Sequence, residues 1–517
     1  METLDRTEWD VVIVGTGLAQ SLLALSLSRS GKRVLHLDAN DYYGGEEAAF
    51  SLDEARAWAA KHAAVDVSSS THSHAAITTK QDDPTPGEGG DRPRLASSRA
   101  YSLTLSPHLI YARSDLVSTV VSSQIHNQLD FQAVGSWFVL HPRPPAFSIT
   151  RLSRVPSGRE DVFSDTALDL RAKRSLMKFL RFVGHYEEQG DVWEAEKETP
   201  FPTFLEQKFA LPPSSHAPIL ALTLSQKPGS STSTAVALPR IARHLRSLGV
   251  FGPGFSAVLP KWGGLAEIVQ VACRACAVGG GVYVLNKGIR SVEKERRDEE
   301  PSAHIQLDGG ENVSTRWLVG LDNDLRAVLQ GRPARADETV ATSRSISIVS
   351  SPLASLFPRT SEGGPIPAGA VISVPSANAD EPPVFVLAHT SEAGECPMNQ
   401  SVLYASVALP AEQGHERLRQ AVTVLLDNVT ERDPQEGQVK PEVLWEMAYQ
   451  QTTPVSGDVQ IGDDGVITLP AMAQDLVFDD GVLGGVKQAW QCITGEGPDV
   501  FMQFDAREGV GDDELND

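Results

Sequence analysis

The chain has 517 residues, with 45 Lys and Arg against 67 Asp and Glu, and it contains four cysteines. This length exceeds what one ordinary hydrophobic core serves, so we expect two or more domains. The formal net charge of -22 argues against nucleic acid as a partner, and four cysteines are too few for a disulfide framework. The acidic surface suits simple solubility, or the handling of partners that carry basic segments.

The sequence has no apolar run of the roughly 18 residues that a membrane span needs. The N-terminal residues METLDRTEWD also lack the pattern of a signal peptide. We therefore expect a cytoplasmic protein.

The N-terminal segment has the pattern of a nucleotide-binding unit. A β-branched run over 11–14 is typical of a strand buried in a parallel sheet, and Gly15 and Gly17 follow it where a tight turn leads into a helix. A second strand is predicted over 33–37. Asp38 follows this strand directly. It lies about 20 residues past the glycines, where an acidic residue can meet a ribose hydroxyl. The pattern predicts a Rossmann-type start.

The third glycine of this fingerprint is missing. Gln20 stands where a glycine would let the first helix pack closely on the strand. The motif is therefore degenerate, which weakens the case for a bound dinucleotide.

Three sequence motifs in this region carry a family resemblance: VGTGL, KRVLHLDAN and DYYGGEEA, in this order and at tight spacing. They resemble the superfamily of Rab GDP-dissociation inhibitors and Rab escort proteins. The resemblance implies an α/β, flavoprotein-like fold (FAD/NAD(P)-binding, Rossmann-type) with a mixed β-sheet and an inserted small all-helical domain. It also implies that no flavin or other cofactor is bound, and that the Tyr-Tyr-Gly-Gly segment around Tyr43 lies in the platform that receives the GTPase.

Further along the chain, residues 51–64 can form a helix and 131–140 read as a strand. Between them, residues 67–98 are polar and rich in Ser, Thr, Pro and Gly, so we predict a disordered insertion. His72 and His74 lie inside it, and a solvated loop is the simpler reading than a metal site.

A small helical domain is predicted next. Ser164 or Asp165 can cap a helix that runs to about His185. Further helices are predicted over 217–224 and 239–248.

The rest of the chain returns to a sheet. A helix over 266–277 is followed by a strand over 282–285, and short β-type runs between 289 and 409 predict a mixed sheet. A closing helix is predicted over 481–492. The residues from 501 onward form an acidic end that we expect to fray.

Cys273 and Cys276 form a lone CxxC on the helix over 266–277. No second pair or nearby histidine completes a tetrahedral zinc site, so we interpret both as packing residues, and we predict no metal site.

These elements define the predicted domains. They are a discontinuous sheet domain, a disordered insertion, a helical domain and an acidic tail. Their bounds are, in the same order, 1–158 with 251–500, then 67–98, 159–250 and 501–517. The resemblance implies that the sheet domain carries the platform, and that the helical domain docks on a prenyl transferase and shields the prenyl group.

Glu267 and Arg274 are seven positions apart, two helical turns, so they project from one face. On spacing alone this is a solvated helix side. The resemblance implies more, because the family has this Glu and this Arg before a segment that here reads GGVYVLNK, and uses them with Tyr43 to bind Rab. Arg99 matches a further family arginine.

Phe163 and Arg174 are 11 positions apart, about three helical turns, so one face could present both. A Phe before a helix can also be an inward staple. Escort proteins carry V-F followed at this spacing by K-R-x-L-M-K-F-L, and use the Phe and the Arg to dock on the α subunit of Rab geranylgeranyltransferase. The chain therefore resembles the escort branch.

The sequence contains no HExxH, P-loop or GxSxG motif. The resemblance implies a non-catalytic accessory subunit that binds GDP-bound Rab GTPases, presents them to the transferase, shields the attached geranylgeranyl lipid and contacts membranes transiently. Apolar helix faces around Met177, Leu180 and Leu245 are the expected lipid lining, unless they form only that domain's core. A Rab GDP-dissociation inhibitor and a flavin-dependent oxidoreductase remain the alternatives.

Overall fold

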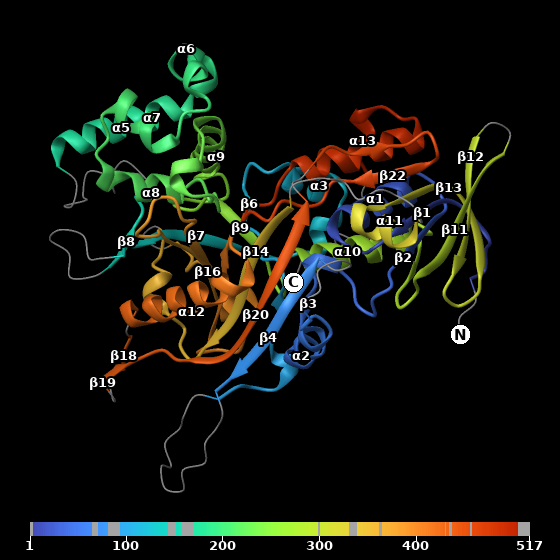
Figure 1. The fold of residues 1–517 in the computed structure, drawn as a ribbon, viewed down its shortest axis with the longest axis horizontal. Helices are drawn as coiled ribbons and strands as arrows, with labels where there is room; N and C mark the ends of the chain where they lie inside the picture. Colours follow the sequence, from blue (N-terminus) through green and yellow to red (C-terminus); the bar gives the residue numbers. More distant parts are fainter. Residues whose placement is uncertain are drawn as a thin grey trace, which may run out of the picture.

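A computed structural model describes residues 4–64, 71–80, 94–142, 151–156, 169–297, 300–329, 339–360, 364–429, 431–433, 437–454 and 457–504. The chain forms two large sheets and a helical unit that packs on one end of the second sheet (Figure 1). Within these described ranges, no helix has both the length and the apolar character needed to cross a bilayer.

The first sheet is built around the predicted N-terminal strand. β1 pairs in parallel with β2 on one side and with β13 on the other, and β13 continues into an antiparallel meander at the far edge (Figure 1). In spatial order the strands are β10 (Val282–Val284), β2 (Val34–Leu37), β1 (Glu8–Val14), β13 (Asn312–Leu321), β12 (Glu300–Leu307) and β11 (Ile289–Arg297), with β22 (Val466–Leu469) beside β13 and β21 (Gln460–Ile461) beside β22.

Helices cover this sheet because its central strands are apolar on both faces. On one face the side chains of α1, α10 and α13 form a single buried cluster with those of β1. The other face packs against the meander and α11. The bounds of these helices are α1 (Leu18–Arg29), α10 (Leu265–Val278), α13 (Gly481–Thr494) and α11 (Asp322–Val328).

The second sheet is mostly antiparallel. Its spatial order is β4 (His72–Thr79), β20 (Val443–Pro454), β14 (Thr339–Val349), β17 (Ser401–Val407), β16 (Val384–Thr390), β15 (Gly369–Val374), β7 (Phe131–Leu140), β9 (Ala257–Pro260) and β6 (Ile110–Tyr111), with β8 (Leu152–Arg154) beside β7. α12 (Ala411–Asn428) packs on one face. The β-type runs predicted between 289 and 409 are confirmed as strands, but they divide between the two sheets.

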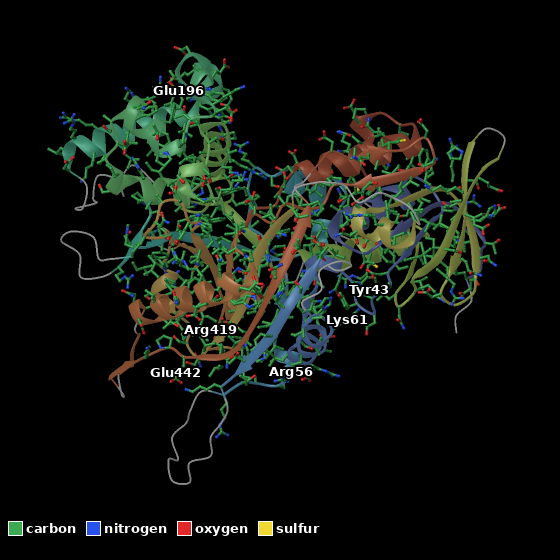
Figure 2. The ribbon with its side chains drawn as sticks, viewed as in Figure 1. Tyr43, Arg56, Lys61, Glu196, Arg419 and Glu442 are labelled. Atoms are coloured by element: carbon green, nitrogen blue, oxygen red, sulfur yellow. The ribbon has the colours of Figure 1, made fainter. Side chains whose placement is uncertain are left out.

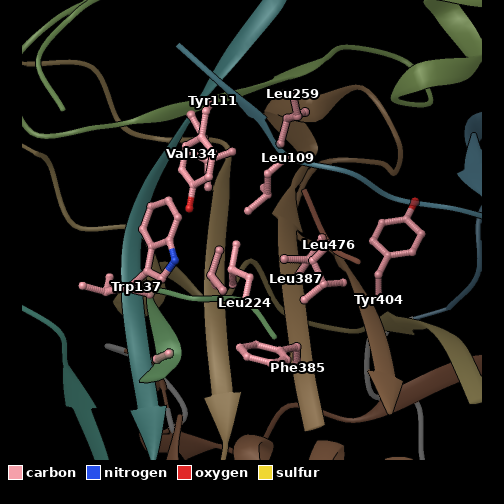
Figure 3. Close-up of a cluster of buried hydrophobic side chains, with 14 of the residues drawn as sticks. Leu109, Tyr111, Val134, Trp137, Leu224, Leu259, Phe385, Leu387, Tyr404 and Leu476 are labelled. Atoms are coloured by element: carbon pink, nitrogen blue, oxygen red, sulfur yellow. The ribbon is translucent and has the colours of Figure 1, made fainter. Parts of the chain in front are cut away.

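The helical unit leaves this sheet after β8 and returns to it at β9. It contains α5 (Leu170–Gly184), α6 (Gly190–Trp193), α7 (Phe201–Phe209), α8 (His216–Ala221) and α9 (Thr234–Ser247). Phenylalanines hold it together, and the ring centroids of Phe179 and Phe209 lie 5.3 Å apart. The core continues without a break into the second sheet, where Leu224 lies among Phe385, Leu387 and Leu476 (Figure 3).

The helix that ends near His185 starts later than predicted. Asp169, and not Ser164 or Asp165, caps α5, because its carboxylate accepts a hydrogen bond from the Ala172 N–H at 2.7 Å. An acceptor that reaches the N3 amide satisfies one of the four unpaired donors of a helix start. α7 was not predicted, and Pro239 lies inside α9 instead of beginning it.

The predicted disordered insertion over 67–98 needs correction. Residues 72–79 form β4, an edge strand that pairs antiparallel with β20. The polar composition of this segment does not indicate a strand. Its strand character depends on pairing with β20, more than 360 residues later in the sequence. His72 is buried against Trp58, with ring centroids 5.1 Å apart, so it is a packing residue and not part of a solvated loop. Residues 81–93 lie outside the described part of the chain.

The start of the predicted acidic tail also needs correction. Phe501 and Met502 are buried, and the Phe501 ring lies 5.4 Å from that of Trp490 on α13. The start of the 501–517 segment therefore belongs to the core of the first sheet, and residues 505–517 lie outside the described ranges.

Shorter elements complete the chain. α2 has a capping box, in which Ser51 and Glu54 satisfy each other's backbone donors. The remaining bounds are α2 (Leu52–Lys61), α3 (Asp115–Ser122), β3 (Ala49–Phe50), β5 (Leu103–Thr104), β18 (Glu431–Asp433), β19 (Gly437–Val439), and the short 3-10 helices η1 (Gly45–Glu47) and η2 (Ser98–Ala100).

Candidate partner-binding platform

The solvent side of α10 is a narrow polar stripe. Glu267, Gln270 and Arg274 lie along it, and most of the other α10 side chains are buried. Nη2 of Arg274 lies 3.5 Å from Oε1 of Glu267, so the two predicted residues share one face. The Arg274 side chain is 58% exposed and that of Glu267 only 17%. A guanidinium held by a neighbouring carboxylate is a preorganised donor for a partner.

Tyr43 lies on the segment that follows β2 (Figure 2), next to Cys273 of α10. Its ring meets that of Tyr283 edge-on, with centroids 5.7 Å apart, and Tyr283 in turn packs on His36 at 4.4 Å. Burial raises the pKa of Tyr43 to about 12, with smaller contributions from the Cys273 thiol, so the hydroxyl stays protonated at neutral pH. Tyr43 therefore offers a fixed ring and a neutral donor.

Asp38 holds the platform segment against the glycine turn. Its carboxylate accepts hydrogen bonds from the N–H of Thr16 at 3.0 Å and from the Thr16 hydroxyl at 2.6 Å. The same Thr16 hydroxyl accepts from the N–H of Gly44 at 3.1 Å, next to Tyr43. Asp38 is buried. These internal bonds engage the carboxylate that the sequence pattern places opposite a ribose hydroxyl.

The glycine turn after β1 is filled by side chains. Gly15 has a φ of +84°, and a Cβ placed there would lie 2.5 Å from a carboxylate oxygen of Asp324. Gln20 donates to that carboxylate at 3.1 Å. Gly17 is equally covered, because a Cβ there would lie 2.8 Å from the amide oxygen of Gln20. Gln20 therefore replaces the third glycine of the motif, and its side chain also packs against the first two glycines.

A side-chain carboxyl group also occupies the start of the helix that would bind a diphosphate. Oε2 of Glu47 accepts a hydrogen bond from the N–H of Leu18, at the start of α1, at 3.1 Å. Burial raises the pKa of Glu47 to about 8, and the neighbouring Glu46 adds to the shift. The positive end of a helix is where a dinucleotide's phosphates normally bind. The residues present here do not fit a flavin dinucleotide.

Arg99 and the cysteine pair lie in different surroundings. Arg99 is exposed on η2, three residues before Ser102, whose hydroxyl donates to the carbonyl of Trp262 at the entry to α10. Cys273 and Cys276 are both buried in α10, as the packing interpretation predicts, and the thiol of Cys276 faces the carbonyl of Ala24 on α1 at 3.4 Å. The described residues contain no cluster of three or more potential metal ligands.

The surface of α5 is basic. Arg171, Arg174, Lys178 and Arg181 are exposed along one side, at the helical spacings of three and four residues. Arg174 is therefore available to a partner. Phe163 lies outside the described residues, so its relation to Arg174 remains a prediction.

The expected lipid-lining residues are half-buried. Met177, Leu180 and Leu245 pack against the continuous core that the helical unit shares with the second sheet. None of these three residues lines the cavity of about 490 Å³ that is formed by the start of α7, by α8 and by the connection between β15 and β16. The hydroxyl of Ser230 donates to the Ala379 carbonyl at 3.1 Å across this junction.

Sequence reasoning missed one exposed aromatic beside the platform. Trp262 precedes α10, is 48% exposed and has a φ of +67°. A signal was present in the sequence, since Trp262 is followed by Gly263 and Gly264, a pair that permits a turn closed to most residues.

The mixed sheets, the glycine turn after β1 and the helical insertion define a class of protein: α/β proteins with a flavoprotein-like fold. The chain matches the family described as GDP dissociation inhibitor over residues 5–72 and 75–358, which is more than half of its length. The protein belongs to that family.

Curated relatives carry more specific names. The chain is 34% identical over 283 residues to the protein named "Rab proteins geranylgeranyltransferase component A" of Saccharomyces cerevisiae, which covers 54% of this chain and 44% of the yeast protein. It is 26% identical over 522 residues to "Rab escort protein 1" of Arabidopsis thaliana, covering 87% of this chain and 86% of the plant protein. The chain thus spans less than half the length of the yeast relative.

Solved structures support the fold. The Rab GDI of Plasmodium falciparum superimposes with a TM-score of 0.65 at 18% identity, covering 95% of this chain and 99% of the other. An oxidoreductase from Methanosarcina mazei superimposes with a TM-score of 0.56 at 10% identity, covering 93% of this chain and all of the other. The predicted flavoprotein-like fold is confirmed.

Proposed function

We propose that this protein is a Rab escort protein. It binds newly made, GDP-bound Rab GTPases, presents them to Rab geranylgeranyltransferase for prenylation of their C-terminal cysteines, and accompanies the prenylated Rab to membranes. Support comes from the family and from relatives whose names contain "geranylgeranyltransferase component A" or "Rab escort protein". In this proposal the protein is a non-catalytic, cytoplasmic accessory subunit that contacts membranes transiently.

One observation supports the proposal most strongly. The fold keeps a glycine turn of the nucleotide-binding type, but side chains of the protein fill it, and charged and aromatic side chains are exposed on the neighbouring surface. Glu47 takes the amide at the start of α1, and the exposed Arg274 stands with Glu267 and Tyr43 nearby. Arg and Tyr are typical anchors of protein interfaces. We propose that Tyr43, Glu267 and Arg274 contact the GTPase, that Arg99 contributes, and that no flavin is bound.

Docking on the transferase is assigned to α5. The exposed Arg174 lies in a basic stripe on a chain of net charge -22, so this helix is suited to an acidic partner surface. We propose that Arg174, with Phe163, contacts the α subunit of the transferase. The geranylgeranyl group would lie against the helical unit, with Met177, Leu180 and Leu245 as its lining.

The deciding experiment is a pull-down of purified transferase α subunit with this protein in the presence of GDP-loaded Rab. Capture of the α subunit supports the escort reading. Rab binding without capture of the α subunit indicates a Rab GDP-dissociation inhibitor instead. A visible absorption spectrum of the purified protein tests the oxidoreductase alternative, because a bound flavin would colour it yellow.

A further inference from the structure

We propose that Trp262 and Met398 form an apolar contact surface for the GTPase, at the end of the platform where α10 begins. This inference rests on the proposed function, from which it takes its partner. The Trp262 side chain is 48% exposed and that of Met398 is 80% exposed. Trp and Met are both enriched at protein interfaces relative to the rest of a protein surface.

The backbone at Trp262 is strained and is held in place. Its φ of +67° is followed by +131° at Gly263 and +64° at Gly264. A bulky residue adopts the left-handed region only where its surroundings fix it. Here the Trp262 N–H donates to the Ala393 carbonyl at 2.8 Å, and the Trp262 carbonyl accepts from the Ser102 hydroxyl at 2.6 Å. The chain keeps this conformation at a cost, although a glycine would adopt it freely.

The indole ring of Trp262 packs against the backbone of a neighbouring connection. A Cβ at Gly394 would lie 2.5 Å from Cδ1 of Trp262, so the ring rests directly on the backbone of the connection between β16 and β17. Nζ of Lys261 lies 4.9 Å from the ring centroid. A side chain that is already immobilised loses little conformational entropy on binding.

Hydrogen bonds of the buried Glu395 hold the connection between β16 and β17 in place. The buried Glu395 carboxylate is bonded through Oε2 to Nδ1 of His389 at 2.9 Å and accepts from the Tyr404 hydroxyl at 2.9 Å. The Glu395 carbonyl accepts from the N–H of Ser102 at 3.1 Å. Met398 lies in the same connection, four residues past the glycine on which Trp262 rests. The backbone against which the exposed Trp262 ring packs is therefore held by several hydrogen bonds.

The surface around Trp262 is continuous with the platform. Glu267 lies five residues further on, in the first turn of α10. On the other side, a Cβ at Gly263 would lie 2.7 Å from the Cβ of Ala49, on the segment that follows Tyr43. Trp262 is therefore close to the two segments that carry Tyr43 and Glu267.

The charge at this end favours a protein over a lipid surface. Lys261, the cation nearest the ring, is itself 3.5 Å from the carboxylate of Asp130. Attraction to an anionic bilayer depends on clustered, unneutralised Lys and Arg. The apolar surface therefore suits an apolar patch of the GTPase.

The test is a calorimetric titration of the full chain with a GDP-loaded Rab. Trp262→Ala should raise the Kd about 10-fold or more, as truncation of an interface aromatic does. Trp262→Phe, which keeps a ring, should recover much of the affinity. Met398→Glu provides a variant without a folding cost, because that side chain is almost fully exposed, and it should also weaken binding. Ile461→Ala, an exposed apolar residue on β21, is the matched control and should change nothing.

The outcomes separate this inference from the proposed function. If Tyr43→Ala and Arg274→Ala weaken binding while Trp262→Ala and Met398→Glu do not, the apolar surface is wrong and the Rab platform stands. If the unaltered protein binds no Rab, the proposed function fails and this inference fails with it. If Trp262→Ala and Met398→Glu reduce only binding to vesicles of anionic phospholipid, the surface contacts membranes and the inference is overturned.

Discussion

The side-chain oxygen Oε2 of Glu47 accepts a hydrogen bond from the backbone N–H of Leu18, 3.1 Å away, at the first turn of α1. In a dinucleotide-binding protein this amide faces a phosphate, because the helix N-terminus carries partial positive charge. Here the protein supplies its own acidic group. The bond ties the platform segment, which continues through η1, to the centre of the first sheet.

The first prediction concerns the pH dependence of stability. Burial raises the pKa of Glu47 to about 8 and that of Asp324 to about 7, from ordinary values of 4.5 and 3.8. The folded state therefore binds more protons than the unfolded state between these limits. The stability from these protonated groups is complete below about pH 4 and is lost as the pH rises through 7 to 8.

Glu47→Gln removes this titration and keeps an acceptor for the Leu18 amide. Relative to the unaltered protein, the variant should gain free energy of unfolding as the pH rises from 5 to 8, measured by urea unfolding at each pH. The exposed Glu188→Gln serves as the control. A difference between Glu47→Gln and the unaltered protein that stays constant with pH would contradict the assigned burial.

The second prediction concerns the start of α5. Asp169→Ala removes the side-chain acceptor of the Ala172 N–H, so the free energy of unfolding should fall by about 1 kcal/mol. Asp169→Ser keeps a capping oxygen and should lose much less. Thermal unfolding of both variants measures the difference. Equal stability of the two would mean that the cap contributes nothing.

The third prediction concerns the platform. Arg274→Ala and Tyr43→Ala should each weaken binding of a GDP-loaded Rab by roughly 1 to 4 kcal/mol, because both offer preorganised contacts. Arg419 on α12 is an exposed arginine that lies well away from Tyr43 in Figure 2, and Arg419→Ala is the matched control. Unchanged affinity in both platform variants, measured by calorimetry, would place the interface elsewhere.

Local sequence patterns predict the first sheet well. The apolar run of β1, the glycine turn and the helix carrying Glu267 and Arg274 all depend on neighbours within a few residues, and all are present. β4 could not be predicted in this way, since its strand character comes from pairing with β20.

The candidate site shows the same limit. The shared face of Glu267 and Arg274 follows from helical spacing. The exposed position of Trp262 does not, because its backbone conformation depends on contacts with Ala393 and Gly394, more than 130 residues later. The closing of the glycine turn likewise depends on Asp324, which no local pattern connects to Gln20.

The last prediction concerns the surface of α5. Phe163→Ala with Arg174→Ala should uncouple the protein from the transferase while Rab binding survives, because α5 belongs to the helical unit and α10 to the first sheet (Figure 1). Each truncation should cost roughly 2 kcal/mol or more of transferase binding. If Phe163 is instead an inward staple, Phe163→Ala lowers the melting temperature and damages both activities together.

The most direct measurement is in vitro prenylation of a GDP-loaded Rab by purified geranylgeranyltransferase, with and without this protein. The proposed function predicts transfer of the geranylgeranyl group only when the protein is added, and a rate at least roughly tenfold lower with the Phe163→Ala, Arg174→Ala variant at limiting concentrations. A protein that binds Rab but gives no stimulation, or a stable double variant that supports full prenylation, would contradict the escort function.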